Sequence, residues 1–272
     1  MENTRFDLTG KVAIVTGGTG VLGKAMLKGL LEHGATGIII GRNADKISAT
    51  IDEFLEESYI VDGYKADVLN KQELEVARKE ILAKYKKIDI LVNAAGGHIQ
   101  EAIQQTGQTI FDIELEAIRK TIDLNMFGTV YPTLIFGKYM AETGAGSIVN
   151  ISSMAAMRSV SRVMGYSLAK SAIDTFTKWM SMELGFVNQD RVRINAIAPG
   201  FFLTEQNRNI LTNEDGTLTE RAEKIIQHTP VGRLGEPEEL VSTLIWLCSD
   251  ASKFVTGTII PVDGGFSKFS GV

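Results

Sequence analysis

Short apolar runs alternate with longer amphipathic stretches along the chain. The runs are rich in β-branched residues and end in glycine or polar residues, which is typical of buried strands. The longer stretches repeat apolar residues at helical spacing, as Leu74, Ala77 and Ile81 do between residues 72 and 85. Strands that alternate with helices predict a parallel sheet with helices on both faces. The expected strands cover residues 11–16, 37–41, 60–65, 88–93, 147–153, 192–198 and 256–262.

The predicted helices connect these strands in the order of an α/β fold. They are expected from the glycine-rich stretch at 17–23 to His33, over 44–57, 72–85 and 115–142, through Tyr166 to Gly185, and from Glu236 onward. A chain of 272 residues fits one large α/β domain or two small ones, and the unbroken alternation favours a single domain over residues 1–272. Residues 204–229 are polar and contain a turn signal at 213–216, so the segment 201–230 is expected to form a lid over a pocket.

Composition and charge exclude several classes of protein. A net charge of −5 gives no basic footprint for nucleic acid, and the apolar runs are shorter than the ~18 residues of a membrane span. The N-terminal residues lack the basic and apolar regions of a signal peptide. Cys248 is the one cysteine and indicates a buried thiol and a reducing, cytoplasmic location. The three histidines, His33, His98 and His228, are scattered, so no metal site is expected.

A glycine-rich loop after the first strand is the first candidate site. Strand, glycine loop and helix in this order favour a pyrophosphate on the helix N-terminus, although a tight turn without a ligand has the same glycines. About 20 residues further on, where a dinucleotide fold meets the adenosine ribose, the chain has Arg42 rather than an acidic residue. Arg42 favours NADP(H), but it could also be a solvated side chain. NAD(H) stays open, because Asp45 follows and the loop has no basic residue.

Tyr166 and Lys170 form the second candidate site, because residues four apart lie on one face of a helix. A lysine ammonium nearby favours the phenolate, so the pair is a possible acid/base unit. Ser153 ends the fifth predicted strand and is placed to bind a substrate oxygen; Ser152 is the alternative. Asn125 falls among apolar residues in the middle of a predicted helix, where it either bonds the neighbouring strand or holds a water near Lys170.

These motifs together resemble the classical short-chain dehydrogenase/reductases over nearly the whole length of the protein. The resemblance implies a Rossmann-like, doubly wound sheet of about seven strands and a homotetramer. It also implies that Ser153 polarises the substrate oxygen, Tyr166 transfers the proton, Lys170 holds the ribose and lowers the Tyr166 pKa, and Asn125 anchors a relay water. Two departures are Val21 in place of a loop glycine and Ala94 in place of an asparagine. The expected cofactor-binding residues are Gly17, Gly18, Thr19, Gly20, Val21, Leu22, Arg42, Asn43, Asp67, Val68, Asn93, Ala94, Ala95, Gly96, Tyr166, Lys170, Ile197, Pro199, Gly200 and Thr204.

Asp67 has a second interpretation as an N-terminal cap of the helix that follows it.

The loop pattern and the segments around 199–237 and 261–272 are similar to the D-mannonate oxidoreductases (fructuronate reductases) within this family. A sugar acid needs a cation for its carboxylate and donors for its hydroxyls. Another ketoreductase, of gluconate 5-dehydrogenase or acyl-thioester type, and a catalytically silent binding protein remain alternatives. The candidate substrate contacts are His98, Arg158, Arg162, Gln206, Asn207 and Arg208.

Overall fold

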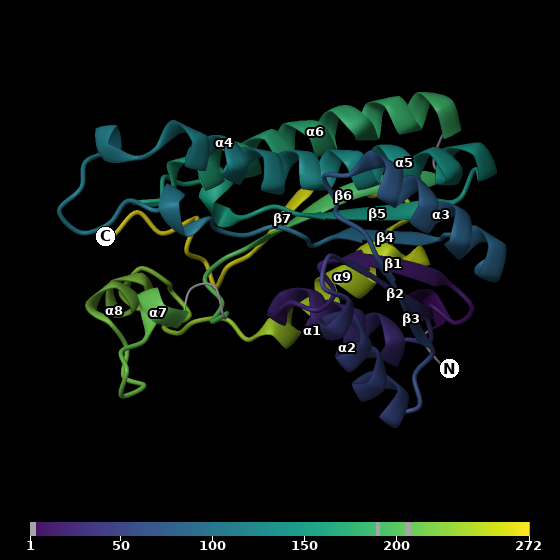
Figure 1. Ribbon diagram of the computed structural model, residues 1–272, viewed down its shortest axis with the longest axis horizontal. Coiled ribbons are helices and arrows are strands. Elements are labelled where there is room, and N and C mark those ends of the chain that lie inside the picture. The colour runs from purple at the N-terminus through teal and green to yellow at the C-terminus, as the bar shows by residue number, and fades with distance from the viewer. Residues whose placement is uncertain (1–3, 189–190, 205–207, 272) are drawn as a thin grey trace.

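The first apolar run of the chain becomes strand β1 (Val12–Thr16), in which all residues are buried. The computed structural model describes residues 4–188, 191–204 and 208–271, and in it β1 lies within a sheet of seven parallel strands. The sheet that the sequence predicts is therefore confirmed (Figure 1). The other strands are β2 (Thr36–Gly41), β3 (Val61–Lys65), β4 (Ile90–Asn93), β5 (Gly146–Ile151), β6 (Val192–Pro199) and β7 (Ile259–Val262).

The strand order is β3-β2-β1-β4-β5-β6-β7, so the chain reverses its direction of travel across the sheet between β1 and β4. Ligands of open α/β sheets bind at such a switch point, beyond the carboxyl ends of the strands. Thr16 ends β1 directly opposite Asn93 at the end of β4. The glycine-rich loop and the turn at 94–97 therefore meet at this edge, as a dinucleotide site requires.

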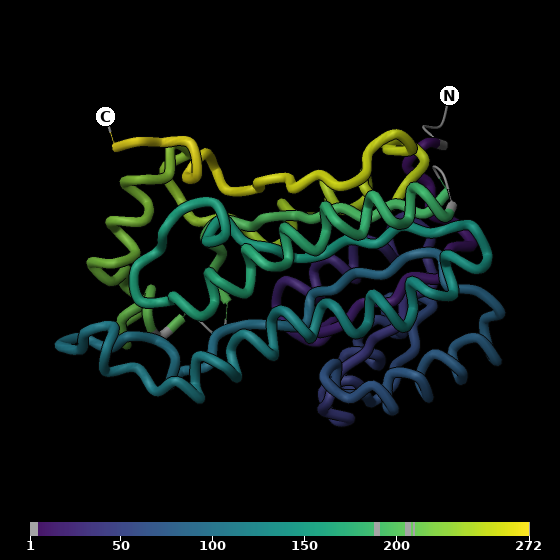
Figure 2. The backbone as a smooth tube through the Cα atoms, turned by 90° about the horizontal axis from the view of Figure 1, so that it is seen from above, coloured from purple at the N-terminus to yellow at the C-terminus, as the bar shows by residue number. Residues whose placement is uncertain are grey.

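Helices cover both faces of the sheet. In Figure 1 the helices α3 to α6 lie on one side of it, and α1, α2 and α9 lie on the other. Figure 2 shows α5 and α6 running lengthwise over the same face, and places the two termini at opposite ends of the molecule. The helices are α1 (Val21–Glu32), α2 (Ala44–Glu56), α3 (Lys71–Tyr85), α4 (Leu115–Ile122), α5 (Gly128–Thr143), α6 (Met164–Asn188), α7 (Arg208–Leu211), α8 (Glu220–Gln227) and α9 (Val241–Cys248). Short 3₁₀ segments are η1 (Thr4–Phe6), η2 (Gln100–Ala102), η3 (Ile110–Asp112), η5 (Met154–Ala156), η6 (Pro237–Leu240) and η7 (Asp250–Ser252).

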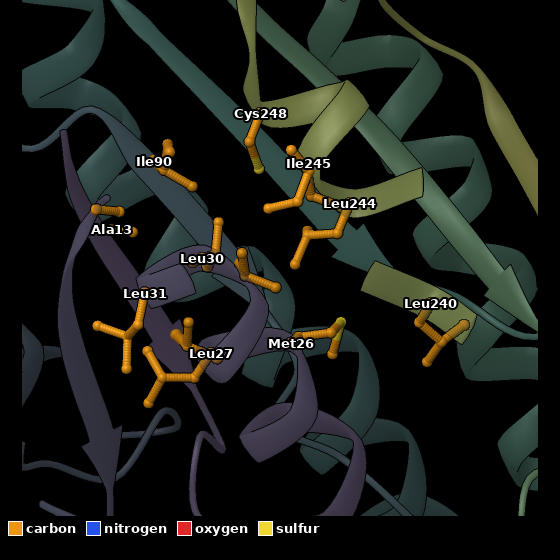
Figure 3. Close-up of a cluster of buried hydrophobic side chains, with 14 of the residues drawn as sticks. Ala13, Met26, Leu27, Leu30, Leu31, Ile90, Leu240, Leu244, Ile245 and Cys248 are labelled. Atoms are coloured by element: carbon orange, nitrogen blue, oxygen red, sulfur yellow. The ribbon is translucent and has the colours of Figure 1, made fainter. Parts of the chain in front are cut away.

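The core on the α1 side is built from the apolar positions that repeat along that helix. Met26, Leu27 and Leu30 are fully buried in one apolar cluster with Leu244 and Ile245 of α9 (Figure 3). The two helices pack closely, because a Cβ at Gly29 would lie 2.3 Å from the Val241 side chain. Cys248, at the end of α9, is buried as expected, and burial raises the pKa of its thiol to about 12. The cysteine therefore acts as a small apolar core residue.

The helix expected over residues 115–142 is not continuous. A π-helical turn, η4 (Asp123–Phe127), separates α4 from α5, and Asn125 lies within it. Strand β5 also ends two residues earlier than expected, so Ser152 and Ser153 follow the strand instead of closing it. Ser153 caps η5, where its hydroxyl accepts a hydrogen bond from the Ala155 amide at 3.1 Å. Both differences re-aim polar side chains at the sheet edge, and π turns are frequent at functional sites.

Residues 201–204 follow the end of β6, and residues 208–230 form a small layer of their own beyond the sheet (Figure 1). Leu211, Ala222 and Ile225 make a separate apolar cluster there, against which Phe201 and Phe266 pack. That this segment acts as a lid over the pocket stays a prediction. Among the helices described, none is long and apolar enough to cross a membrane.

Candidate active site

Four predicted catalytic residues converge beyond the ends of β4 and β5. Helix α6 carries Tyr166 and Lys170 one turn apart, with the lysine nitrogen 5.4 Å from the centre of the tyrosine ring. Tyr166 is hydrogen-bonded to Ser153. Asn125 approaches from the π turn, since a Cβ at Gly96 would lie 2.7 Å from its amide oxygen and 3.7 Å from the Lys170 nitrogen. Residues distant in sequence therefore form one cluster.

The two neighbouring serines take different partners, which separates their roles. Ser152 Oγ donates a 2.5 Å hydrogen bond to Asp174, whereas Ser153 bonds Tyr166. The geometry thus favours Ser153 for the substrate oxygen. Asp174 lies one turn beyond Lys170 on α6, and sequence reasoning missed it although the i, i+4 spacing was a usable signal. Burial raises the pKa of Asp174, and the hydrogen bond from Ser152 opposes that rise.

Lys170 is buried and donates a 2.7 Å hydrogen bond to the Ile151 carbonyl at the end of β5. Burial lowers its pKa to about 8, and the Asp174 carboxylate partly offsets that effect. The amine is therefore mostly protonated at pH 7 but titrates close to it. The bond to the Ile151 carbonyl holds the Lys170 side chain in place, and the remaining N–H groups of the ammonium can donate further hydrogen bonds.

The pKa of Tyr166 is raised, whereas the sequence predicts that Lys170 lowers it. Burial raises it above its usual value of 10, and the hydrogen bond with Ser153 only partly offsets this. The physical reason is that desolvation of the phenolate outweighs its stabilisation by the surrounding groups. At neutral pH the residue is a neutral phenol, which can give a proton to a carbonyl oxygen.

His98 stacks on Tyr166, with ring centres 4.4 Å apart and planes at 44°. Burial, followed by the charges of Lys170 and Arg221, lowers its pKa to about 4. The imidazole is therefore neutral at pH 7, with one nitrogen that donates and one that accepts. Such a ring can orient a hydroxyl group beside the Tyr166 oxygen, as expected of a substrate contact.

This shift predicts a pH-dependent stability. The unfolded chain takes up a proton on His98 near pH 6.5 but the folded protein only near pH 4, so stability falls as pH drops between these values. The loss amounts to roughly 3 kcal/mol. His98→Gln should flatten that part of the profile, as measured by urea unfolding midpoints at several pH values. Equal pH dependence in both proteins would show that His98 is not the group responsible.

Asn125 uses its amide to hold the loop that follows β4. Its oxygen accepts from the Gly97 amide at 2.9 Å, and its nitrogen donates to the Gly97 and Thr121 carbonyls at 2.8 and 2.9 Å. Of the two roles predicted for Asn125, this is close to the structural one. The amide binds the loop that follows the neighbouring strand rather than the strand itself. The relay water remains a prediction. Through Gly97, Asn125 fixes the segment that leads into His98.

The glycine loop fits a dinucleotide phosphate group. Gly17 has φ +68° and a Cβ there would lie 2.8 Å from the Ala95 backbone, which joins the loop to the turn after β4. The Ala95 amide also donates to Thr16 Oγ1 at 3.1 Å. At Gly20, in contrast, a Cβ would meet no described atom closer than 3.4 Å, and no side chain caps α1. The protein itself does not require glycine at this position, whereas a pyrophosphate approaching the first amides of α1, at Val21 and Leu22, would.

The predicted ribose-binding residues lie together at the ends of β2 and β3. The Arg42 guanidinium is exposed and lies 3.9 Å from the Asp67 carboxylate. Asn43 caps α2, and its side chain accepts from the Lys46 amide. The helix α3 is capped by Asn70, so the alternative role of Asp67 as its cap is wrong. Asp67 instead accepts from the Leu69 amide at 2.9 Å.

Other predicted cofactor residues have structural roles within the sheet. The Asn93 side chain is buried and donates to Thr133 and Asn150, both at 2.8 Å. Gly200 is needed for packing, since a Cβ there would lie 2.6 Å from Asp263. Gly18, Thr19, Val68, Ala94, Pro199 and Thr204 lie along the same edge of the sheet, as the strand order requires.

The predicted substrate arginines are not equivalent. Arg158 donates to the carbonyls of Ser267 and Phe269, so it holds the C-terminal segment. Arg208 is exposed at the start of α7, and Gln206 and Asn207 lie outside the described residues. Arg221, which sequence reasoning missed, acts on His98 through its charge. Within the described part of the protein no group of histidine, cysteine or acidic residues could hold a metal ion.

Comparison with known proteins agrees with this geometry. Residues 19–267 match the family model described as enoyl-(acyl carrier protein) reductase. The chain is 40% identical to the uncharacterized oxidoreductase UxuB of Bacillus subtilis (strain 168), with 98% of both proteins covered. It is similar to the structure of a candidate D-mannonate oxidoreductase from Haemophilus influenza with bound NAD, with 36% identity, a TM-score of 0.89 and 98% of both chains covered. It is also similar to a gluconate 5-dehydrogenase from Burkholderia cenocepacia J2315 in complex with NADP and tartrate, with 29% identity, a TM-score of 0.86 and 97% of both chains covered.

The sheet order, the Tyr166–Lys170 pair and these similarities agree over almost the full length of the protein. The chain therefore belongs to the short-chain dehydrogenase/reductase family, and it is an NAD(P)-dependent oxidoreductase that acts on CH–OH groups.

Proposed function

We propose that the protein interconverts D-mannonate and D-fructuronate. The observation that carries this proposal is the composition of the site wall: the neutral phenol of Tyr166 lies under neutral His98, within the field of Arg221. A hydroxylated, negatively charged substrate matches this combination of a proton donor, a hydrogen-bonding ring and a cation. The similarity to a candidate D-mannonate oxidoreductase supports the same substrate.

The chain's own residues account for the proton and for the orientation of the substrate. Ser153 donates a hydrogen bond to the carbonyl oxygen, and Tyr166 transfers its phenolic proton to that oxygen as the carbon is reduced. The Lys170 ammonium, one turn away, stabilises the phenolate that remains. A bound nicotinamide cofactor supplies the hydride in this direction and accepts it in the other. The glycine loop and the first amides of α1 would hold its pyrophosphate.

The cofactor preference is proposed to be NADP(H), because Arg42 stands where the 2′-phosphate would lie. Asp67 lies close to Arg42 and weakens this preference by offering a competing partner. Arg42→Ala should raise the Kd of NADPH by about threefold to tenfold and leave that of NADH nearly unchanged, since an exposed cation contributes modestly. Fluorescence titration with each cofactor measures both values. An equal change for the two cofactors would contradict the assignment.

A gluconate 5-dehydrogenase activity is the second candidate. It also needs a cation for a sugar-acid carboxylate, and a similar structure with this name binds NADP and tartrate.

The homotetramer also stays a prediction. The apolar helix α9 is mostly buried within the chain, so the edge strand β7 is the better candidate for a subunit contact.

Steady-state assays with NADH and NADPH decide between these functions. D-fructuronate, 5-keto-D-gluconate and a 3-oxoacyl thioester should be compared at matched concentrations. We expect the highest kcat/KM for D-fructuronate. Turnover of 5-keto-D-gluconate without turnover of D-fructuronate would reject the first function in favour of the second. Nicotinamide binding without turnover of any carbonyl compound would indicate a catalytically silent protein.

A further inference from the structure

Two arginines from distant segments line two neighbouring cavities. Arg221 lies in the first turn of α8, and Arg162 lies in the loop that leads into α6. Both line a cavity of about 420 Å³ and a second one of about 410 Å³. The second cavity is also walled by Gln100 and Gln105, which belong to the loop that carries His98. Arg221 therefore belongs to the predicted lid, and it faces Arg162 and the loop that carries His98 across these cavities.

The two guanidinium groups repel each other without a described carboxylate to balance them. Burial lowers the pKa of Arg221, and the charge of Arg162 lowers it further. None of the ion pairs among the described residues includes either arginine. Glu220 lines both cavities but is paired with Lys224. An anion bound between the two arginines would be attracted to both guanidinium groups and would offset their mutual repulsion.

Hydrogen bonds hold the Arg221 side chain, and a backbone hydrogen bond holds the loop that carries Arg162. Arg221 donates to the hydroxyl and the carbonyl of Ser161, at 3.0 and 3.2 Å. A guanidinium has five N–H donors, so three remain after these bonds. Arg162 adopts φ +76°, which is uncommon for a residue other than glycine, and its carbonyl accepts from the Gln104 amide at 3.0 Å. Strained residues of this kind cluster at ligand clamps.

Arg221 also lies within electrostatic reach of His98, next to the reaction centre. The charge of Arg221 acts on His98, whose ring stacks on Tyr166. The acid group of a substrate whose carbonyl group contacts Tyr166 would then point past His98 toward Arg221. Arg158, in contrast, has its guanidinium occupied by the C-terminal carbonyls.

We propose that Arg162 and Arg221 form the carboxylate subsite of this enzyme, and that they select sugar acids over neutral sugars. This inference rests on the proposed function, because it assigns the acid group of that substrate. Two guanidinium groups give a carboxylate charge-assisted hydrogen bonds on two sides. The competing interpretation is that the bonds from Arg221 to Ser161 only fasten α8 to the loop.

The test compares Arg162→Gln, Arg221→Gln and Arg221→Lys with the unchanged protein. Arg119→Gln serves as the control, because it removes an exposed guanidinium of α4 that is paired with Glu116 and Asp123. Each glutamine variant should raise the KM for D-fructuronate by about 10- to 100-fold, with a smaller change in kcat. Arg221→Lys should lose less, since it keeps the charge but not the planar fork. For D-fructose, which has CH₂OH in place of the carboxylate, kcat/KM should change less than about twofold.

A binding measurement separates this inference from the proposed function. The Kd of tartrate, measured by calorimetry, should rise in both glutamine variants and stay constant in Arg119→Gln. If no sugar acid is turned over but tartrate binding still depends on both arginines, the proposed function fails and the subsite stands. Unchanged tartrate affinity in the glutamine variants, or equal losses for D-fructose and D-fructuronate, would overturn the subsite. A melting temperature for each variant confirms that the protein is folded.

Discussion

Replacing Tyr166 with phenylalanine should lower kcat for carbonyl reduction by about 10²- to 10⁴-fold, the usual contribution of a positioned proton donor. The phenol is partly buried, neutral at pH 7 and hydrogen-bonded to Ser153, so it is a positioned proton donor. Phenylalanine keeps the ring that stacks on His98 and loses only the hydroxyl. Cofactor affinity should therefore change little. Single-turnover kinetics with saturating cofactor measures the chemical step directly.

Tyr131→Phe is the matched control for this experiment. Tyr131 lies on α5, stacks on Phe127, and has a hydroxyl that makes no hydrogen bond to the described residues. Removing this hydroxyl should leave kcat unchanged. Near-normal turnover by Tyr166→Phe would show that another group supplies the proton, and His98 would then be the next candidate because of its contact with the ring.

The second large effect is expected at the glycine loop, where two substitutions should separate folding from cofactor binding. Gly17→Ala combines a left-handed backbone with a Cβ 2.8 Å from the Ala95 backbone, and should cost about 2–4 kcal/mol of stability. Gly20→Ala meets only an ordinary contact at 3.4 Å, at a helix N-cap, and should cost less than about 1 kcal/mol. The added methyl group at Gly20 should nevertheless weaken cofactor binding at least about tenfold, because the pyrophosphate needs close backbone approach.

Gly10→Ala supplies the control for backbone strain alone. Gly10 has φ +73°, but a Cβ there meets nothing within 4 Å. Melting temperatures should rank Gly20→Ala highest, then Gly10→Ala, then Gly17→Ala. In cofactor titrations of the folded variants, Gly20→Ala should show the largest loss of affinity for its small loss of stability. A Gly20→Ala protein with normal cofactor affinity would show that the phosphate group does not approach this residue.

Much of the fold is predictable from the sequence because its cause is local and repetitive. The β-branched runs and the helical spacing of residues such as Leu27 and Leu30 identify buried elements without reference to their neighbours. Glycines at positive φ and proline at a helix start, as at Pro237, mark boundaries for reasons of backbone sterics. The π turn at Asn125 was not predictable, because it depends on the hydrogen bonds that Asn125 makes with Gly97.

The candidate site divides in the same way. Tyr166, Lys170 and the glycine loop carry signals in their spacing, so the sequence is sufficient to find them. The choice between Ser152 and Ser153 depends on which of them faces Asp174 and which faces Tyr166. The direction of the Tyr166 pKa depends on burial, and burial is a sum over many residues from different elements.

By itself the sequence determined the order of strands and helices along the chain and the family resemblance, and it singled out the proposed acid/base pair. The elements and the Tyr166–Lys170 spacing follow from residues a few positions apart, and the resemblance follows from motifs matched in order along the chain. Only the tertiary structure placed Arg221 beside Arg162 and within reach of His98, because those segments are distant in sequence and meet through packing of the small layer beyond the sheet. The electrostatic character of the site likewise arises from desolvation and from long-range charges, which a linear pattern does not encode.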